Sequence, residues 1–505
     1  MQRVLSQHKR HQLHSSDASS AVEAQALATH APHELMQRAG TAVAKLAQAV
    51  APHARSVWVL AGPGNNGGDG LVAAHQLQLA GWRVRASLLG NESALPPDAA
   101  WALNEARQAG VTIDDDITGR PAGVVIDALL GLGASREPDG KMAEAISNIN
   151  QLQATRLSVD LPSGLNPDTG QCLGNEAVIA THTLALLTLK PGLFTAAGRD
   201  HAGDIWFDTL GVSTNPAAAV AMRLAGSADL AAAWPARPHA SHKGSNGEVA
   251  VVGGAPGMTG AALLASRAAL AAGAGKTFVA MLDDAAPAGD ADRPELMFRR
   301  QWWLSGAETL SRTTVVCGCG GGAAVAATMP VLLSRCARLV LDADALNALA
   351  ADAALRQLLD ARAARGHTTV LTPHPLEAAR LLGIDVRQVQ TDRVRWAREL
   401  SQRHGCVALL KGSGSVIAAP DGSVVINPTG NALLATAGTG DVLAGWLGGL
   451  WAQRGGNALQ VAVASAWLHG RAADLAAQEF PGHGTLRAGE LIKQMRCVAA
   501  TTTPS

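Results

Sequence analysis

The feature that most constrains how this chain can fold is an alternation, repeated along its length, between short apolar runs and longer segments of helical periodicity. This alternation is typical of a mostly parallel β-sheet covered by helices. In the first half it predicts strands at residues 56–60, 82–89, 124–129, 156–160 and 183–188, and a helix at 71–80. A second series predicts strands at 248–252, 277–282, 313–317, 338–341, 368–371, 407–410, 415–418 and 423–426, with helices at 261–272, 441–453 and 458–478. The chain is therefore expected to be an α/β protein with two sheets.

The length of 505 residues supports two domains, because a single hydrophobic core rarely grows beyond about 250–300 residues. The periodicity weakens after residue 213, and the segment 231–238 is rich in alanine and proline, as linkers are. We expect a first domain at 1–222 with a Rossmann-like α/β/α sandwich, a linker or domain edge at 223–240, and a second α/β domain at 241–505.

The composition excludes several classes of protein. The formal net charge is zero, so no overall field attracts nucleic acid or an anionic membrane. No run reaches the roughly 18 apolar residues of a membrane span, and the first residues lack the apolar run of a secretory signal, although a transit peptide stays an alternative. The six cysteines are scattered, unlike those of a disulfide framework. We expect a cytoplasmic homo-oligomer without nucleic-acid or membrane partners.

The densest motif of the first half is a glycine-rich loop at residues 62–70, between a predicted strand and a predicted helix. Its first six residues match the G-x-G-x-x-G of dinucleotide-binding proteins, but residues 88–90 lack the acidic side chain which that fold places after the next strand. A Rossmann dehydrogenase is therefore disfavoured. The loop offers backbone N–H groups to an anion, and Asn65, Asn66 and Asp69 add side-chain oxygens.

Two further strand ends carry polar residues, at Asp127 and at Asp160 with Ser163. The carboxyl ends of parallel strands line one crevice, so these side chains are expected to lie near each other. Asn66, Asp127 and Ser163 would supply hard oxygens suited to a monovalent or hard cation, and Asp160 is a candidate general acid or base. The alternative is that Asp127 and Asp160 are helix caps and turn formers.

Together these segments resemble the YjeF N-terminal family, the NAD(P)H-hydrate epimerases. The resemblance covers most of residues 20–215 and includes the segments 34–40, 65–70, 131–137, 160–164 and 190–193. It implies that hydrated NADH or NADPH (NADHX or NADPHX) is the substrate, that Asp160 is catalytic, and that K⁺ binds at Asn66, Asp127 and Ser163. It implies substrate contacts from Asn65, Asn66, Gly67, Gly68, Asp69, Gly131, Leu132, Gly133, Ala134, Ser135, Arg136, Glu137 and Asp160.

The second half has a glycine turn at residues 438–441 that opens a predicted helix. Glycines let the backbone approach a phosphate, and a helix N-terminus supplies N–H donors and positive potential. Asp441 in the first turn is positioned to take the proton of an acceptor hydroxyl during phosphoryl transfer. The alternative is an ordinary helix with an acidic residue in its first turn.

Other strand ends of the second half also carry polar residues. The segment 411–415 lies between two strands and offers Lys411 and backbone donors to a nucleotide, and His374 lies at a strand end with Glu377 three residues later. A P-loop is disfavoured, because the near-match at residues 275–277 lacks the first glycine and follows a helix instead of a strand.

This half resembles the ribokinase-like superfamily and, more closely, the YjeF C-terminal family of ADP-dependent NAD(P)H-hydrate dehydratases. The resemblance covers about 250 residues, including the segments 242–244, 257–261, 293–297, 342–347, 372–377, 411–415 and 438–441. It implies nucleotide binding by Lys411, Gly412, Ser413, Gly414, Ser415 and Gly440, and substrate contacts from Ala261, Gly320, His374 and the catalytic Asp441. One departure is Cys317, where the family usually has proline. This cysteine would make the loop less rigid, or oxidisable.

The two resemblances together imply a bifunctional enzyme, both isomerase and lyase, that repairs hydrated NADH and NADPH. One half would interconvert the R and S epimers, and the other would dehydrate the S form with ADP and Mg²⁺, releasing AMP and phosphate. A vitamin-precursor kinase of the same superfamily and a scaffold with inactive domains are the alternatives. The intact Asp160 and Asp441 favour the enzyme over the scaffold.

Overall fold

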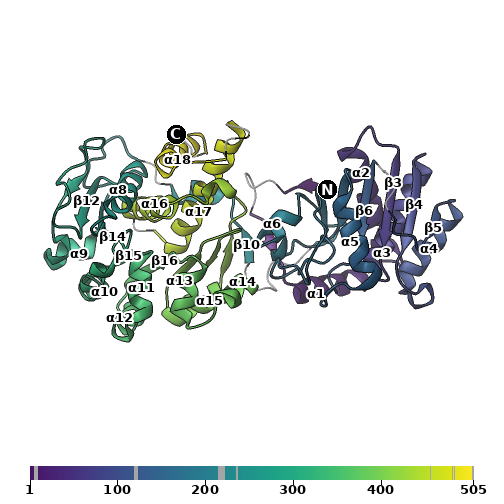
Figure 1. Ribbon diagram of the computed structural model, residues 1–505, viewed down its shortest axis with the longest axis horizontal. Helices are drawn as coiled ribbons and strands as arrows, with labels where there is room; N and C mark the ends of the chain where they lie inside the picture. Colours follow the sequence, from purple (N-terminus) through teal and green to yellow (C-terminus); the bar gives the residue numbers. More distant parts are fainter. Residues whose placement is uncertain are drawn as a thin grey trace. The chain divides into compact units, whose positions relative to one another are not determined.

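The computed structural model describes residues 1–4, 10–118, 123–213, 222–234, 237–454, 456–479, 482 and 484–502. The chain forms two compact units, one of Met1–Leu5 and Gln12–Ala219 and the other of Ser6–His11 and Val220–Ser505. Each unit is built around its own β-sheet, with helices packed on the sheet (Figure 1). The two sheets predicted from the periodicity are therefore present.

The sheet of the first unit has the strand order β1-β9-β8-β7-β6-β3-β4-β5. All neighbours pair in parallel except β1, which is antiparallel to β9. The chain builds β4 and β5 on one side of β3 and then returns to β6 on the other side, so β3 and β6 form a topological switch point. Ligands of open α/β sheets bind outside the carboxyl ends of the strands at such a point.

The residues of the first unit form strands β1 (Gln2–Arg3), β2 (Gln12–Leu13), β3 (Ser56–Ala61), β4 (Arg83–Leu88), β5 (Thr112–Asp114), β6 (Val124–Ala128), β7 (Thr155–Val159), β8 (His182–Leu186) and β9 (Asp204–Asp208). The helices are α1 (Ser16–Leu27), α2 (Glu34–Val50), α3 (Asn65–Leu79), α4 (Pro97–Gln108), α5 (Gly140–Gln151) and α6 (Gly198–His201), with short 3₁₀ turns η1 (Glu92–Ala94) and η2 (Pro191–Phe194).

Alternation along the strands places helices on both faces of this sheet. Val57 and Val59 of β3 join a core with α2, α3 and α4, whereas Trp58 and Leu60 join a second core with α5. Side chains of successive strand residues point to opposite faces, so an apolar run without polar interruptions is buried on both sides. The first unit is thus an α/β/α sandwich, as the sequence predicts.

The strands that the second unit contributes to its sheet follow one another in the order β13-β12-β11-β14-β15-β16-β17-β18-β19-β10. Neighbours from β13 to β17 are parallel, and β18 is antiparallel to both β17 and β19. Here the chain changes direction at β11, with β12 on one side and β14 on the other. The switch point therefore lies between β11 and β14.

The strands of this unit are β10 (Met222–Leu224), β11 (Glu248–Gly253), β12 (Lys276–Met281), β13 (Met297–Phe298), β14 (Thr314–Cys317), β15 (Arg338–Leu341), β16 (Thr368–Leu371), β17 (Val407–Leu410), β18 (Val416–Ala418) and β19 (Val424–Ile426). The helices are α7 (Ser227–Ala233), α8 (Thr259–Ala271), α9 (Ala307–Arg312), α10 (Met329–Arg335), α11 (Asp344–Ala351), α12 (Ala353–Ala364), α13 (Pro375–Leu382), α14 (Val386–Thr391), α15 (Arg393–His404), α16 (Thr439–Arg454), α17 (Ala458–Glu479) and α18 (Ala488–Thr502), with 3₁₀ turns η4 (Trp302–Leu304), η5 (Ala323–Ala327) and η6 (Ala432–Leu434).

Helices α8 and α16 pack unusually closely. A Cβ atom at Gly445 of α16 would lie 2.0 Å from the carbonyl oxygen of Ala265, and one at Gly449 would lie 2.4 Å from that of Ala269. The backbones touch because glycine and alanine stand at the contact points. This contact fixes the position of α16, whose N-terminus carries Asp441.

Several features differ from the sequence expectation, among them strands β5, β9 and β13, which the periodicity did not predict. Helix α3 begins at Asn65 and not at residue 71, because the glycine-rich loop itself continues into the first helical turn. Helix α18 follows the two predicted closing helices. The predicted linker at 223–240 contains most of β10 and all of α7, whose Leu230 is fully buried, so tertiary packing orders a segment of weak periodicity. Among the described residues, no helix is long and apolar enough to cross a membrane.

Candidate active sites

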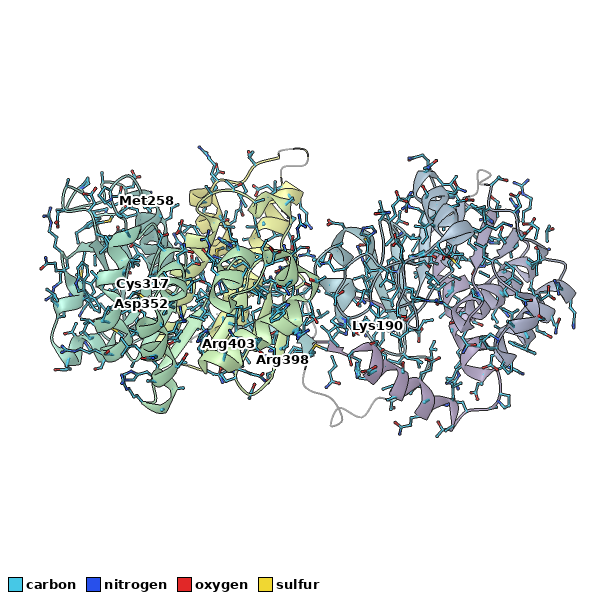
Figure 2. The ribbon with its side chains drawn as sticks, turned by 60° about the horizontal axis from the view of Figure 1, so that its bottom comes forward. Lys190, Met258, Cys317, Asp352, Arg398 and Arg403 are labelled. Atoms are coloured by element: carbon cyan, nitrogen blue, oxygen red, sulfur yellow. The ribbon has the colours of Figure 1, made fainter. Side chains whose placement is uncertain are left out.

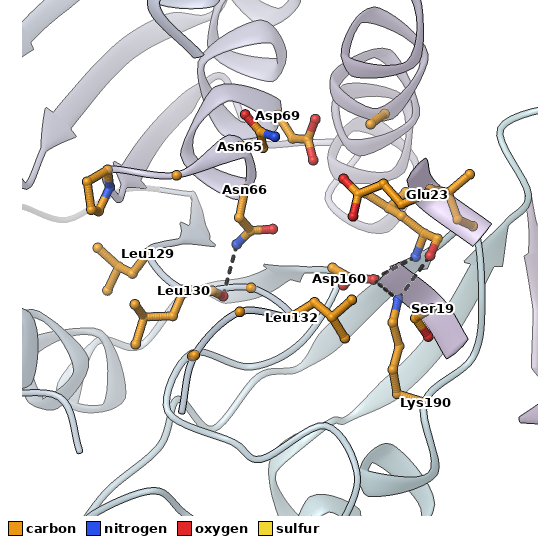
Figure 3. Close-up of a pocket in the computed structure, with 18 of the residues that line it drawn as sticks. Ser19, Glu23, Asn65, Asn66, Asp69, Leu129, Leu130, Leu132, Asp160 and Lys190 are labelled. Carbon is orange, nitrogen blue, oxygen red and sulfur yellow. Dashed lines mark hydrogen bonds and ion pairs between the residues drawn. The ribbon is translucent and has the colours of Figure 1, made fainter. Parts of the chain in front are cut away.

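A cavity of about 780 Å³ lies at the carboxyl ends of β3, β6 and β7, at the switch point of the first sheet (Figure 3). Most of the residues implied as substrate contacts line it: Asn65, Asn66, Asp69, Gly131, Leu132, Gly133, Ala134, Ser135, Arg136, Glu137 and Asp160. Gly67 and Gly68 are buried and stand outside this lining. Instead they allow tight packing, since a Cβ at Gly67 would lie 2.0 Å from the Gly62 carbonyl oxygen.

Asp160 directly follows β7 in a left-handed conformation, with φ of +64°. This backbone is strained for a residue other than glycine, and such strain clusters at functional sites. Its Oδ1 accepts a hydrogen bond of 3.0 Å from the Leu186 amide and forms an ion pair with the Lys190 ammonium. Lys190 is 2% exposed and also donates to the carbonyl oxygens of Leu186 and Thr188, at 3.0 and 3.1 Å. The lysine therefore fixes Asp160 at the cavity wall.

Two more carboxyl groups, those of Glu23 and Asp69, face the same cavity (Figure 3). Burial raises the pKa of Asp69 well above its usual range, and the negative charges of Asp160, Glu23 and Asp98 raise it further. Burial, followed by the charge of Asp160, also raises the pKa of Glu23. The cavity thus combines an ion-paired carboxylate with two carboxyl groups that are inclined to hold protons.

Asp127 is fully buried beneath this cavity and organises its loops. Its carboxylate accepts hydrogen bonds from the Ser158 hydroxyl (2.7 Å), the Ser163 amide (2.9 Å) and the Ser163 hydroxyl (2.5 Å). The Leu130 amide donates to the Ser163 hydroxyl at 2.9 Å, and the Asn66 side-chain amide donates to the Leu130 carbonyl at 3.0 Å. The structure therefore brings Asn66, Asp127 and Ser163 together around Leu130.

The second unit gathers polar side chains from three strand ends. Asp342, which follows β15, is 2% exposed and accepts hydrogen bonds from the Lys411 ammonium (2.7 Å) and the Thr372 hydroxyl (2.8 Å). A Cβ at Gly440 would lie 3.4 Å from Lys411 Nζ and 4.0 Å from Asp342 Oδ2. The glycine turn that opens α16 therefore lies directly beside this ion pair.

Asp441, one residue further along α16, completes the group. Burial raises its pKa to about 6, as does the charge of Asp342, whereas a hydrogen bond with the Cys319 thiol and the charge of Lys411 lower it. One ligand atom each of Cys319, Asp342 and Asp441 lies within 4.8 Å of the others. The spacing in the sequence did not indicate this group, because its members come from three separate segments.

The remaining residues implied for substrate contact divide into two places. Gly320 has φ of +58°, and a Cβ there would lie 2.9 Å from that of Ala261, so these two residues adjoin Cys319 at the switch point. His374 caps α13, with its Nδ1 accepting hydrogen bonds from the backbone amides of Leu376 and Glu377 at 3.1 and 3.3 Å. In this structure His374 therefore stabilises the N-terminus of α13.

The loop of Lys411, Gly412, Ser413, Gly414 and Ser415 connects β17 to β18 and is supported from below by a buried cation. Arg393 is 2% exposed and donates to the carbonyl oxygens of Leu410 and Lys411 at 3.3 and 3.1 Å. Gly412 has φ of +138°, and a Cβ there would lie 2.8 Å from the Arg393 guanidinium. Only glycine permits this approach.

Cys317, where the resemblance led us to expect proline, is labelled in Figure 2. It is fully buried, and its sulfur lies 3.8 Å from that of Met329. Burial raises the pKa of its thiol to about 12. The thiolate is the reactive form, so the oxidation considered from the sequence is disfavoured at neutral pH.

Sequence reasoning missed several residues of these sites. Asp342, Glu377 and Lys190 stand in motifs that the sequence had singled out, but no role was assigned to them. Glu23 and Arg393 lie in helical segments without any motif, and only the tertiary structure brings them to the sites.

The fold and these sites define a two-unit α/β enzyme, with a cavity of carboxyl groups in one unit and a glycine turn beside a buried Asp–Lys pair in the other. Comparison with known proteins agrees. The model of the YjeF-related protein N-terminus matches residues 32–192, and the model of the NAD(P)H-hydrate dehydratase family matches residues 249–496. The chain is 39% identical over 464 residues to the bifunctional NAD(P)H-hydrate repair enzyme Nnr of Escherichia coli, covering 90% of this chain and 87% of the relative. The chain belongs to the family of bifunctional NAD(P)H-hydrate repair enzymes.

Two other similar proteins each cover about half of this chain. The ADP-dependent (S)-NAD(P)H-hydrate dehydratase of Neisseria meningitidis is 43% identical over 276 residues, which is 54% of this chain and 91% of that protein. The solved structure of the ADP/ATP-dependent NAD(P)H-hydrate dehydratase of Bacillus subtilis, co-crystallised with ATP and Mg²⁺, is 30% identical. It covers 55% of this chain and 97% of its own, with a TM-score of 0.45.

Proposed function

We propose that this chain repairs hydrated NADH and NADPH with two activities. The first unit epimerises the R and S forms of the hydrate, and the second dehydrates the S form to NAD(P)H with ADP, releasing AMP and phosphate. The observation that carries the proposal is the presence of two separate sites in one chain, in a family whose members are named for both reactions. A vitamin-precursor kinase would need only the second site.

In the dehydratase, Asp441 takes the proton of the ring hydroxyl as the β-phosphoryl group of ADP is transferred to it. The phosphorylated hydroxyl then leaves as phosphate, and the ring loses a proton from the adjacent carbon, which restores the reduced nicotinamide. A base near neutral pKa suits this role, and Asp441 has a pKa of about 6. Lys411 and the amides of Lys411–Ser415 and Gly440 would bind the nucleotide phosphates, and Ala261, Gly320 and His374 would contact the hydrate.

Two metal ions belong to this proposal. K⁺ would bind at Asn66, Asp127 and Ser163, where the donor set consists of hard oxygens and where a fully buried carboxylate, hydrogen-bonded only to neutral donors, gains from a cation. Mg²⁺ would arrive with ADP and neutralise charge on its phosphates. The homo-oligomeric state stays a prediction, and light scattering in solution measures it directly.

The dehydratase assignment is tested by incubating the purified protein with hydrated NADH and ADP. We expect the absorbance of reduced nicotinamide to return, at a rate that Asp441→Asn lowers by about 10²–10⁴-fold, the usual contribution of a general base. A protein that recovers no NADH with ADP or ATP, but phosphorylates a vitamin precursor with ATP, would overturn the assignment.

The epimerase assignment is tested by following each epimer separately with Asp160→Ala. Dehydration of the S form should continue at the wild-type rate, while consumption of the R form should fall to its spontaneous rate. Equal loss of both activities would contradict two independent sites.

A further inference from the structure

The three carboxyl groups of the first cavity differ in their partners. Asp160 has both the Lys190 ammonium and the Leu186 amide, so its negative charge is stabilised. Asp69 and Glu23 have no hydrogen-bond donor or cation within bonding distance among the described residues, although both face the same cavity (Figure 3). Asp160 thus has a cation and a hydrogen-bond donor as partners, whereas Asp69 and Glu23 have neither among the described residues.

The surroundings of Asp69 all favour its protonated form. The charged groups that act on it come from three elements: Asp160 after β7, Glu23 on α1 and Asp98 on α4. Each is a carboxyl group. Of the basic side chains that line the same cavity, Lys190 is paired with Asp160, and the other is Arg136. Burial acts in the same direction, and the pKa of Asp69 is raised well above its usual range.

Epimerisation of the hydrate requires a proton donor for the leaving oxygen and a group that stabilises a positive charge on the ring. Water adds to the reduced ring at the carbon next to nitrogen, so the two epimers differ only at that hydroxyl-bearing carbon. If the C–O bond breaks, its electron pair leaves with the oxygen, and the nitrogen lone pair forms a C=N bond, giving a cationic ring. The oxygen leaves as water only if it receives a proton. Water that then adds from the opposite face returns a proton, so the step requires no co-reactant.

We propose, on the basis of the epimerase function above, that Asp69 donates the proton to the leaving hydroxyl while Asp160, which Lys190 fixes at the cavity wall, stabilises the cationic ring. Asp69 becomes a carboxylate in this step. The water that adds to the other face releases its proton to solvent, and solvent reprotonates Asp69. A pair of carboxyl groups, one of which donates a proton to the leaving oxygen, is the usual arrangement for cleaving a C–O bond next to a heteroatom. Glu23 is not the donor; it keeps Asp69 protonated.

The first experiment follows epimerisation of the purified R form by the full-length protein in ¹⁸O-labelled water. Each inversion should incorporate one solvent oxygen, at the rate of epimerisation and above the spontaneous background. Opening of the ring at the C–N bond would keep the original oxygen, so inversion without matching incorporation overturns the proposal.

The second experiment compares variants of the acid. Asp69→Asn should lower kcat of epimerisation by about 10²–10⁴-fold with little change in KM, while dehydration of the S form by the same preparation shows that the chain is folded. The wild-type rate should fall as pH rises through the raised pKa of Asp69. Glu23→Gln removes a carboxyl group that raises the pKa of Asp69, so it should move this alkaline limb to lower pH. Asp17 is an exposed acid on the same helix as Glu23. As the control, Asp17→Asn should change neither the maximal rate nor the position of the alkaline limb.

The outcomes separate this inference from the function on which it rests. A wild-type protein that fails to epimerise would refute the function itself. A wild-type protein that epimerises, with Asp69→Asn at the same rate or with Glu23→Gln as the inactive variant, would leave the function standing and refute Asp69 as the donor.

Discussion

At the scale of single residues, the chemistry of both sites depends on how burial and neighbours change the protonation of a carboxyl group. Asp441 has a raised pKa because burial and Asp342 outweigh the Cys319 thiol and Lys411. Asp160 instead has a buried lysine as its partner. The residue type is the same, and the neighbours decide whether the carboxyl group serves as a base near neutral pH or as the partner of a buried cation.

The pH dependence of the dehydratase follows from the pKa of Asp441. The base must be ionised, so kcat/KM should be constant above pH 6 and fall about tenfold per unit below it. Cys319→Ala removes a hydrogen bond that lowers this pKa, so the acid limb should move to higher pH. Cys317→Ala, a change of the neighbouring buried thiol, is the matched control and should leave the limb in place. An unchanged limb in Cys319→Ala would contradict the contact.

Lys190→Met tests the ion pair of the first cavity. Removing one partner leaves the Asp160 carboxylate without its cation, which typically costs about 3–5 kcal/mol when the pair is buried. We expect loss of epimerisation and a lower denaturant midpoint for the first unit. The double variant Asp160→Asn/Lys190→Met should be more stable than Lys190→Met alone, because no unpaired charge remains. If the double variant is less stable, the lysine contributes mainly through packing.

At the scale of elements, the hydrophobic periodicity of the sequence predicts most of the strands and the central helices. Strands β15, β16 and β17 have the predicted bounds, and the other predicted strands differ by one or two residues at their ends. Apolar runs buried on both faces cannot easily form anything else. Periodicity failed for β10, α7 and α18, because short or terminal segments are ordered by packing against elements that are distant in the sequence.

The close contact between α16 and α8 should be necessary for full dehydratase activity. Gly445→Ala places a Cβ 2.0 Å from the Ala265 carbonyl oxygen, so the helices must separate. We expect a loss of about 1–3 kcal/mol in unfolding free energy and a lower dehydratase rate, since α16 positions Asp441. Gly489→Ala in α18 has no atom within 4 Å of the new Cβ and should keep both properties. Equal effects of the two substitutions would show that helix propensity, and not the close contact, is responsible.

At the scale of the whole molecule, each unit has its own hydrophobic core, with no buried residue shared between the described clusters. A ligand that binds only the folded state stabilises it by about 2.7 kcal/mol at 100 times its Kd. Thermal unfolding should therefore show two transitions, and ADP should raise only the one that Gly445→Ala lowers. A single transition that moves with ADP as a whole would show that the two units unfold together.

The sequence by itself determined the two α/β sheets, most of their strands and the loops at the strand ends, because periodicity and glycine turns are local properties of the chain. It also supplied the polar residues of those loops, including Asp160 and Asp441. Only the tertiary structure decided their partners. Glu23 reaches the cavity of Asp69, and Lys411 reaches Asp342, because the strand order places distant segments side by side. Protonation depends on these neighbours, so the chemistry of each carboxyl group could not be read from its position in the sequence.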